Sequence, residues 1–363
     1  MSAPVIAKPR KFIDHVSHYF RHVKETDEKP RTLKHILREL KGLVIPADGI
    51  RIIDVGIGDG TLLKGILDFI TRKKSDAPIF VVGKEYNGAD VLKTLPKLAE
   101  HFAKHPNSVI VLTNKTAKDA ATLARDIRKP LARHDIQLNG HNPHVLGGEL
   151  NTLEAFINDA WQHDKGKSVK DAMLVISHAD HHEQLQHLIP QDGVQIDGFD
   201  IALASQPWRT AQTITFKAKA FIAPLAAALR DNGKLIAVQT VGVGTAYKLM
   251  CKLLSKETLQ RNIPNQPIAV MFAEVKEQIC HTNQFECKSR KFCYGLSGKH
   301  FKVSRAFVRK LLREGIYAFQ IPPNEAKTSL SKAIRMWSGM LERPSRLLVT
   351  NELSVIRKKP TLG

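Results

Sequence analysis

The chain has 363 residues, of which 43% are hydrophobic, so it can bury the core of one large domain or of one domain with additions. Lys and Arg (55) outnumber Asp and Glu (35), which gives a net charge of +20. This charge would attract a nucleic acid or another acidic partner, or it serves only to keep the surface solvated. Four cysteines exclude a disulfide-rich scaffold, and no apolar run is long enough to span a membrane or to form a signal peptide, so we expect a cytoplasmic protein with reduced thiols.

Residues 1–48 are expected to form a helical N-terminal extension. Apolar residues recur three and four positions apart in 11–20 and in 33–40, as on the buried face of an amphipathic helix. These helices either shape a ligand pocket or simply pack on a sheet. The remainder, residues 49–363, is expected to form one α/β domain.

Residues 51–60 contain the clearest motif. An apolar run at 52–55 predicts a buried strand, and a turn with Gly56, Gly58 and Gly60 follows it directly. Residues 61–70 then show helical spacing of apolar side chains. Strand, glycine turn and helix form the first unit of a nucleotide site, in which glycine lets a ligand approach the main chain and the helix start supplies free N–H groups.

Carboxylates surround this turn. Asp54 and Asp59 flank the glycines, and a second apolar run at 79–83 leads to Glu85. A carboxylate after the second strand is the group expected to accept from both ribose hydroxyls of a nucleoside. A loop lined by carboxylates suits a cationic or zwitterionic ligand better than a pyrophosphate, which requires N–H donors and positive charge.

These residues resemble the S-adenosylmethionine site of class I methyltransferases. The resemblance implies a doubly wound, mostly parallel sheet of seven strands, and it implies a cofactor site made by Asp54, Gly56, Gly58, Asp59, Gly60 and Glu85, with Tyr86 beside the adenosine. An NAD-linked dehydrogenase shares the signature. Its glycine spacing fits worse, because the last glycine position, counted from Gly56, is Thr61.

The segment after Glu85 is longer than a simple passage from the second to the fourth strand requires. Helices are predicted at 90–102, 119–133 and 153–163, and apolar runs at 109–113 and 172–176 compete for the third strand. Spacing favours 172–176, which makes about 114–170 partly an insertion. Asp180 would then follow the third strand and accept from the adenine amino group; under the alternative, Thr113 or Asn114 would do so.

The pattern becomes regular again after residue 197. A strand at 199–205, a helix at 210–229, a turn at 230–233 and a strand at 234–239 resemble the fourth and fifth strands of the family. Residues of about 245–345 form an elaborated C-terminal part with helices at 246–254 and 302–315. Two apolar runs within 346–358 are expected to be the last antiparallel strands.

Ser205-Gln-Pro-Trp208 follows the fourth strand and is similar to the polar-Pro-Pro-aromatic motif of methyltransferases that modify planar amino groups, although Gln206 replaces the first proline. We therefore assign Ser205 and Trp208 to the acceptor side, with His178 as a general base there. His178 and His182 are one helical turn apart, but adjacent histidines on a helix diverge, and we predict no metal.

The stretch from Cys280 to Cys293 lacks the paired spacing of a zinc knuckle and alternates like a strand, so we expect buried free thiols. Basic and aromatic residues also alternate there, as on a nucleic-acid surface or on a solvated strand.

The predicted function is methyl transfer from S-adenosylmethionine to a nitrogen or oxygen of a small molecule. An RNA or DNA methyltransferase, and a non-catalytic partner subunit with the same fold, are the alternatives. The sequence gives no expectation for the oligomeric state.

Overall fold

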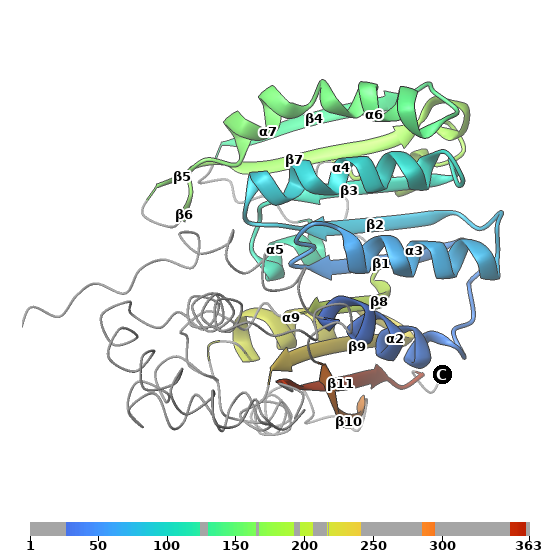
Figure 1. Cartoon of the computed structure of the whole chain (residues 1–363), viewed down its shortest axis with the longest axis vertical. Helices are drawn as coiled ribbons and strands as arrows, with labels where there is room; N and C mark the ends of the chain where they lie inside the picture. The colour runs from blue at the N-terminus through green and yellow to red at the C-terminus, as the bar shows by residue number, and fades with distance from the viewer. Residues whose placement is uncertain are drawn as a thin grey trace, which may run out of the picture.

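The computed structural model describes residues 27–123, 130–164, 167–191, 197–205, 216, 218–240, 285–294 and 349–360. These residues form one nine-stranded sheet in the order β10-β11-β9-β8-β1-β2-β3-β7-β4 (Figure 1). The strands are β1 (Ile50–Val55), β2 (Ile79–Lys84), β3 (Ser108–Thr113), β4 (Leu131–Leu138), β7 (Asp171–His178), β8 (Phe199–Ser205), β9 (Leu229–Thr240), β10 (Phe285–Tyr294) and β11 (Val349–Lys358). A separate short pair is formed by β5 (His163–Asp164) and β6 (Lys167–Ser168).

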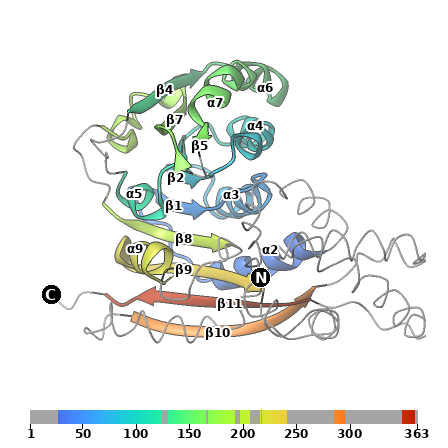
Figure 2. The ribbon, with the colours of Figure 1, turned by 90° about the vertical axis from the view of Figure 1, so that its left-hand side faces the viewer.

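Helices cover both faces of the sheet, which gives three layers (Figure 2). One face carries α2 (Glu28–Leu40), α3 (Thr61–Lys73), α4 (Gly88–Phe102), α6 (Pro143–Asn151) and α7 (Glu154–Ala160). The other face carries α5 (Ala117–Thr122) and α9 (Ala223–Ala227), which continues from a π-helical turn, η5 (Ala218–Ile222). Two 3-10 turns, η2 (Ala179–His181) and η3 (Gln186–Leu188), follow β7.

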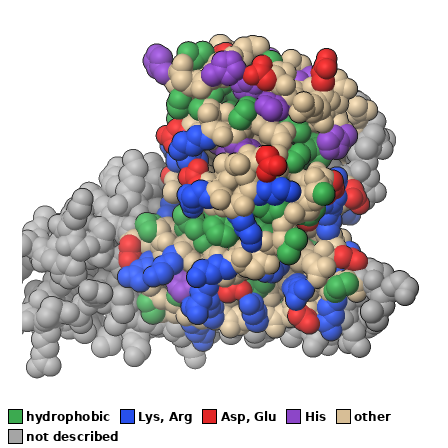
Figure 3. Space-filling model, turned by 90° about the vertical axis from the view of Figure 1, so that its right-hand side faces the viewer, with side chains coloured by type: hydrophobic (Ala, Val, Ile, Leu, Met, Phe, Trp, Pro, Cys, Tyr) green, Lys and Arg blue, Asp and Glu red, His purple; other side chains and the backbone are tan. Residues whose placement is uncertain are grey.

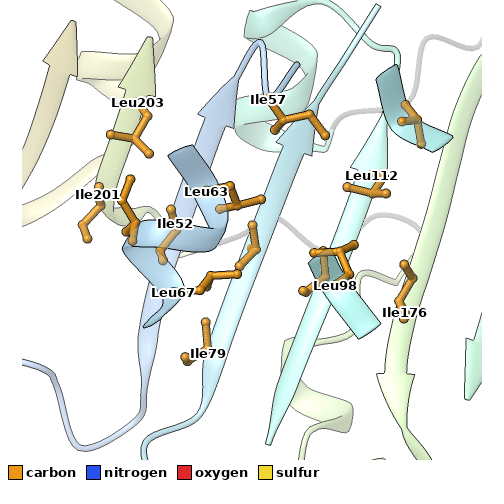
Figure 4. Packing of buried hydrophobic residues seen from close by; sticks show 14 of the residues in the cluster. Ile52, Ile57, Leu63, Leu67, Ile79, Leu98, Leu112, Ile176, Ile201 and Leu203 are labelled. Atoms are coloured by element: carbon orange, nitrogen blue, oxygen red, sulfur yellow. The ribbon is translucent and has the colours of Figure 1, made fainter. Parts of the chain in front are cut away.

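The central strands are mostly apolar because both of their faces are covered. Side chains of β1 alternate between the two layers: Ile52 packs in the cluster under α3 and α4, whereas Ile53 and Val55 pack in the cluster on the other face. Figure 4 shows Leu63 and Leu67 of α3 lying over this part of the sheet.

The direction in which the strands are added reverses at β1. β1 pairs in parallel with β2 on one side and with β8 on the other, and β3 and β9 extend the two halves in parallel. This is the doubly wound, mostly parallel arrangement expected from the sequence. The crevice at the carboxyl ends of β1 and β8 is the topological switch point, where open α/β sheets bind ligands.

The third strand next to β2 is 108–113, so the preference for 172–176 is wrong. Residues 172–176 belong to β7, which runs antiparallel to β3 one position further out, and β4 pairs in parallel with β7. The described sheet therefore has nine strands and not seven. The apolar run of β7 misled the assignment because α6 and α7 cover one of its faces, so it is as buried as a central strand.

Two further expectations need correction. The helix predicted at 119–133 ends at Thr122, and residues 131–133 belong to β4. The last apolar runs form a single strand, β11, which pairs with β9 and with β10 from the cysteine-containing stretch. The helices expected at 11–20, 246–254 and 302–315 lie outside the described residues.

Helix α2 matches the helix expected at 33–40 and is packed into the main core. Ile36 and Leu40 are fully buried there. Gly65 of α3 allows the close contact, because a Cβ atom at that position would lie 2.3 Å from Cδ2 of Leu33. Of the helices that the structure describes, none has both the length and the apolar character that crossing a membrane requires.

A buried histidine predicts how stability changes with pH. Burial lowers the pKa of His101 to about 3, with the charges of His105 and Lys64 acting in the same direction. Below pH 6.5 the side chain of His101 is protonated in the unfolded chain but stays neutral in the folded chain. The free energy of unfolding therefore falls as the pH falls. We expect His101→Gln, which keeps a donor toward Ser108 Oγ, to remove about 2–3 kcal/mol of the loss between pH 6.5 and 4.5.

Urea unfolding at a series of pH values measures this effect. His187→Gln, at an exposed histidine, is the control and should leave the pH profile unchanged. Equal profiles for wild type and His101→Gln would contradict the prediction.

Candidate functional site

The glycine turn lies at the carboxyl edge of the sheet, between the ends of β2 and β8. The main-chain N–H groups of Gly56 and Ile57 donate to the carbonyl of Lys84 over 2.8 Å and 3.2 Å. On the other side, a Cβ atom built on Gly56 would have the carbonyl oxygen of Ser205 as its nearest neighbour, at 3.8 Å. The turn therefore sits at the switch point, with space above Gly56.

Gly60 and Gly56 differ in what surrounds them, and so in the reason why glycine suits each position. All three glycines of the turn have positive φ: 94° at Gly56, 57° at Gly58 and 74° at Gly60. At Gly60, the N-cap of α3, a Cβ atom would lie 2.7 Å from Thr94 Cγ2, so glycine there allows α3 and α4 to pack closely. Gly56 is less crowded, since the nearest atom to a Cβ atom there, the carbonyl oxygen of Ser205, would be at van der Waals distance. Its missing side chain leaves room for a ligand.

Glu85 holds the turn in place. One carboxylate oxygen accepts from the amide of Gly58 (2.8 Å), and the other accepts from the amides of Tyr86 (2.7 Å) and Asn87 (3.0 Å). The Thr94 hydroxyl donates to the carbonyl of Gly58 over 3.2 Å. The carboxylate assigned from sequence to ribose hydroxyls is thus already engaged by three main-chain donors, and about one of its four lone-pair positions remains.

Asp54 is the least satisfied group of the site. Its side chain is 2% exposed, and its Oδ1 atom has no hydrogen-bond partner among the described residues. Burial raises the pKa of Asp54 to about 7, and the charge of Glu85 acts in the same direction. An orphaned buried carboxylate at the end of β1 is matched chemically by a cationic hydrogen-bond donor.

Asp59 is covered by the N-terminal helix. Its Oδ1 accepts from Nζ of Lys29 at the start of α2 and from the amide of Thr61. Burial disfavours the charged carboxylate, but the bond to Lys29 and its charge outweigh burial and hold the pKa of Asp59 below its usual value. Helix α2 therefore packs on the sheet and also contacts the turn through Lys29, whereas a role of the extension in shaping a ligand pocket stays a prediction.

The insertion contributes to the site through Trp161. This side chain is buried, and its Nε1–H donates to the main-chain carbonyl of Glu85 over 3.0 Å. Gly88 lies directly against it, since a Cβ atom there would be 3.0 Å from the Cβ of Trp161. Neither Lys29 nor Trp161 was identified from sequence, because nothing in their local pattern connects them with a turn that is distant in the chain.

Tyr86 follows Glu85 as expected, with Nζ of Lys84 5.5 Å from the centre of its ring. Burial lowers the pKa of Lys84, and the charge of Glu85 opposes that shift. The two side chains form a cation–π contact beside the turn. A role of Tyr86 toward adenosine stays a prediction.

Thr113 and Asn114 fasten the insertion to the end of β3. The Thr113 hydroxyl donates to the carbonyl of Ala172 over 2.6 Å. Asn114 accepts from the amide of Ala172 (2.8 Å) and donates to the carbonyl of Lys170 (3.0 Å). These polar groups hold the beginning of β7 against β3, so the alternative adenine partners considered from sequence are occupied by main-chain groups.

Asp180 and His178 lie at the opposite edge of the sheet. Met173 is level with Thr113, and the strand from Met173 to His178 covers about 17 Å. Asp180 follows that far end. The structure therefore does not bring these two residues to the glycine turn, and the reason is the antiparallel direction of β7, which the sequence analysis read as parallel.

Ser205 ends β8 next to Gly56, as predicted, whereas Trp208 and the rest of its motif lie outside the described residues. The thiols of Cys287 and Cys293 are exposed on β10, so the expectation that they are buried is wrong. Alternation on a strand predicted β10 correctly. It did not reveal which face is covered.

Replacing Glu85 tests its structural role. We expect Glu85→Ala to lower the free energy of unfolding by roughly 2–4 kcal/mol, because three partly buried amides lose a charged acceptor. Glu85→Gln retains one carbonyl oxygen as an acceptor, so its free energy of unfolding should fall by less. Glu154→Ala, at an exposed carboxylate, is the control in urea unfolding. A loss at Glu85 no larger than at Glu154 would contradict the assignment.

Replacing Asp54 should stabilise the protein. Because the folded pKa is raised, from 3.8 to about 7, the folded state is penalised increasingly as the pH rises from 4 to 7. Asp54→Asn removes that penalty, and we expect a gain of about 1–3 kcal/mol at pH 8 that shrinks toward zero near pH 4. Thermal and urea unfolding at both pH values measure it, with exposed Asp76→Asn as the matched control. A gain that does not depend on pH would refute the buried-charge explanation.

No protein-family model matches the chain, and no curated protein matches it in sequence. Solved structures of similar fold include phosphoethanolamine N-methyltransferase 2 of Haemonchus contortus with phosphomonomethylethanolamine and S-adenosylhomocysteine, at 10% identity and a TM-score of 0.37, covering 99% of this chain and 62% of that chain. The same enzyme with S-adenosyl-L-methionine is 11% identical over 91% of this chain and 53% of that chain, with a TM-score of 0.33.

YjhP from E. coli is 11% identical, with a TM-score of 0.35, covering 100% of this chain and 99% of that chain. The matches to the Haemonchus enzyme cover 62% and 53% of that chain, so this chain spans less than two thirds of its length. These similarities are at low sequence identity, and the strand order of the chain itself makes the sheet Rossmann-like.

Proposed function

We propose that this chain is an S-adenosylmethionine-dependent methyltransferase that acts on a nitrogen or oxygen atom of a small molecule. The observation that carries the proposal is the environment of Asp54. A buried carboxylate oxygen with no hydrogen-bond partner among the described residues stands at the end of β1, directly before a glycine turn that has room for a side-chain atom at Gly56. A positively charged donor bound there would satisfy it.

The charges around the turn favour a cationic ligand over a dinucleotide. Asp54, Asp59, Glu85 and Asp90 are all on or next to it. Lys29 neutralises Asp59, and Lys93 pairs with Asp90. A pyrophosphate would meet the carboxyl groups of Asp54 and Glu85, whereas the ammonium and sulfonium of S-adenosylmethionine would be attracted to them.

The residues of the turn fit this cofactor. Asp54 would accept from its ammonium group, the main chain at Gly56 and Gly58 would lie against it, and the remaining lone pair of Glu85 would accept from a ribose hydroxyl. When bound, the cofactor supplies an electrophilic methyl group on a sulfonium. The protein then has to orient the acceptor and exclude water, and buried Trp161 together with α2 closes two sides of the site.

The acceptor would enter beside the end of β8. Ser205 borders the space at Gly56, and it is the described member of the motif proposed to contact the acceptor. Trp208 remains part of this proposal. His178 is no longer part of it, because it lies at the other edge of the sheet.

Basic side chains of the described residues are found at the edge opposite this entrance. Figure 3 views the edge opposite the turn, where Lys and Arg side chains gather over the lower part of the face. Arg51 and Arg230, at the starts of β1 and β9, belong to this edge and are paired with Asp48 and Asp197. These two arginines are engaged within the protein, and the proposal keeps a small molecule as the acceptor.

Isothermal titration with S-adenosylhomocysteine tests the cofactor. We expect wild type to bind, and Asp54→Asn and Gly56→Ala to lose at least about tenfold in affinity, the first by removing the charge and the second by placing a methyl group in the space at Gly56.

Gly198→Ala is the matched control for backbone strain. Gly198 also has positive φ (66°), and it lies at the start of β8, on the opposite edge of the sheet. The Gly198→Ala variant should bind S-adenosylhomocysteine as tightly as wild type, even if the variant is less stable. Binding of NADH in place of S-adenosylhomocysteine would overturn the proposal. Transfer of labelled methyl groups to RNA or DNA, and not to the small-molecule fraction of a cell extract, would overturn the acceptor class.

A further inference from the structure

The two outer strands of the sheet end together, at the edge far from the glycine turn. β4 and β7 run parallel, with Leu138 paired to His178, so the segment after β4 meets the segment after β7. Figure 3 shows histidine side chains gathered over the upper part of this face. None of these residues is needed for the function proposed above.

His178 is held in a fixed orientation. Its side chain is 1% exposed, and its Nε2 lies 2.9 Å from the carbonyl oxygen of Gly140. A carbonyl only accepts, so Nε2 carries the hydrogen, and in the neutral ring Nδ1 keeps its lone pair. Gly140 itself is packed against α6, because a Cβ atom there would lie 2.6 Å from Val145 Cγ1. Histidine ligands of metals are oriented in this way, by a carbonyl on the second ring nitrogen.

Two further ligand atoms face Nδ1 of His178. Oδ2 of Asp180 lies 3.7 Å from it, and Nδ1 of His141 lies 3.8 Å from the same carboxylate oxygen. The three potential ligand atoms are all within 4.8 Å of one another. His141 and Asp180 are largely exposed, so their side chains can move.

We propose that His141, His178 and Asp180 bind a divalent zinc ion. Bonds of about 2.0–2.1 Å in a tetrahedral site place ligand atoms about 3.4 Å apart. The two distances from Oδ2 of Asp180 to the histidine nitrogens must therefore shrink by a few tenths of an ångström, and the distance between the nitrogens of His141 and His178 must shrink by more. Rotation of exposed His141 supplies that movement. The long 3.3 Å contact from the Asp180 amide to Nδ1 of His178 would give way to the metal bond.

Three protein ligands leave a fourth position for water. The ion would tie the loop after β4 to the turn after β7 and so lock the two outer strands of the insertion. This inference reverses the sequence-based expectation of no metal. That expectation considered His178 with His182, but Nδ1 of His182 is 3.0 Å from the Ser177 hydroxyl, and the missing ligand, His141, comes from a distant loop.

Zinc binding to the full-length chain without a polyhistidine tag tests the proposal. After treatment with EDTA and dialysis, competition with a chromophoric chelator should show one tight zinc site per chain. His141→Ala and Asp180→Asn should each weaken it by at least about 10–100-fold, a loss of the size that even outer-shell changes produce. Zinc should also raise the melting temperature of wild type and leave that of both variants unchanged.

His187→Ala is the control, since it removes an exposed histidine from the same segment after β7. It should retain the tight site. Far-UV circular dichroism without zinc verifies that His141→Ala and Asp180→Asn are folded; both positions are exposed, so we expect native spectra. Absence of a tight site in wild type, or an unchanged site in folded His141→Ala and Asp180→Asn, would overturn the proposal.

Discussion

The bonds between the carboxylate of Glu85 and three main-chain amides determine the form of the site. They join the end of β2 to the turn after β1, and they fix Gly58 from one side while Thr94 fixes it from the other. A turn with three glycines at positive φ would otherwise have many conformations available. The hydrogen bonds of one buried carboxylate thus restrict a turn whose glycines do not restrict themselves, and they leave Gly56 accessible to a ligand.

Two buried ionisable groups at opposite edges of the sheet, His101 and Asp54, have shifted pKa values that change stability with pH in opposite directions. His101 is kept neutral and weakens the fold in acid, whereas Asp54 weakens it in neutral and basic solution. His101 lies in packed core and serves the fold. Asp54 costs stability without a compensating bond among the described residues, which is what a group retained for binding does.

The sequence predicted the parts of this architecture that local patterns determine. Strand, glycine turn and helix at 50–73, the strand before Glu85 and the strand ending at Ser205 were found because each combines an apolar run with turn chemistry. The direction of β7 was not found, since an apolar run reads the same in a parallel and in an antiparallel strand. Asp180 was assigned to the wrong edge for that reason alone, and Lys29, Trp161 and His141 act through contacts that only the folded chain creates.

The addition of β7 and β4 also decides which surface ends the sheet. Without them β3, whose six residues are all buried, would present a row of unpaired main-chain groups to other chains. With them the edge is β4, where charged and partly exposed side chains, among them paired Arg133 and Asp135, alternate along the strand. Thr113 and Asn114, which hold β7 in place, therefore protect the protein from edge-to-edge association.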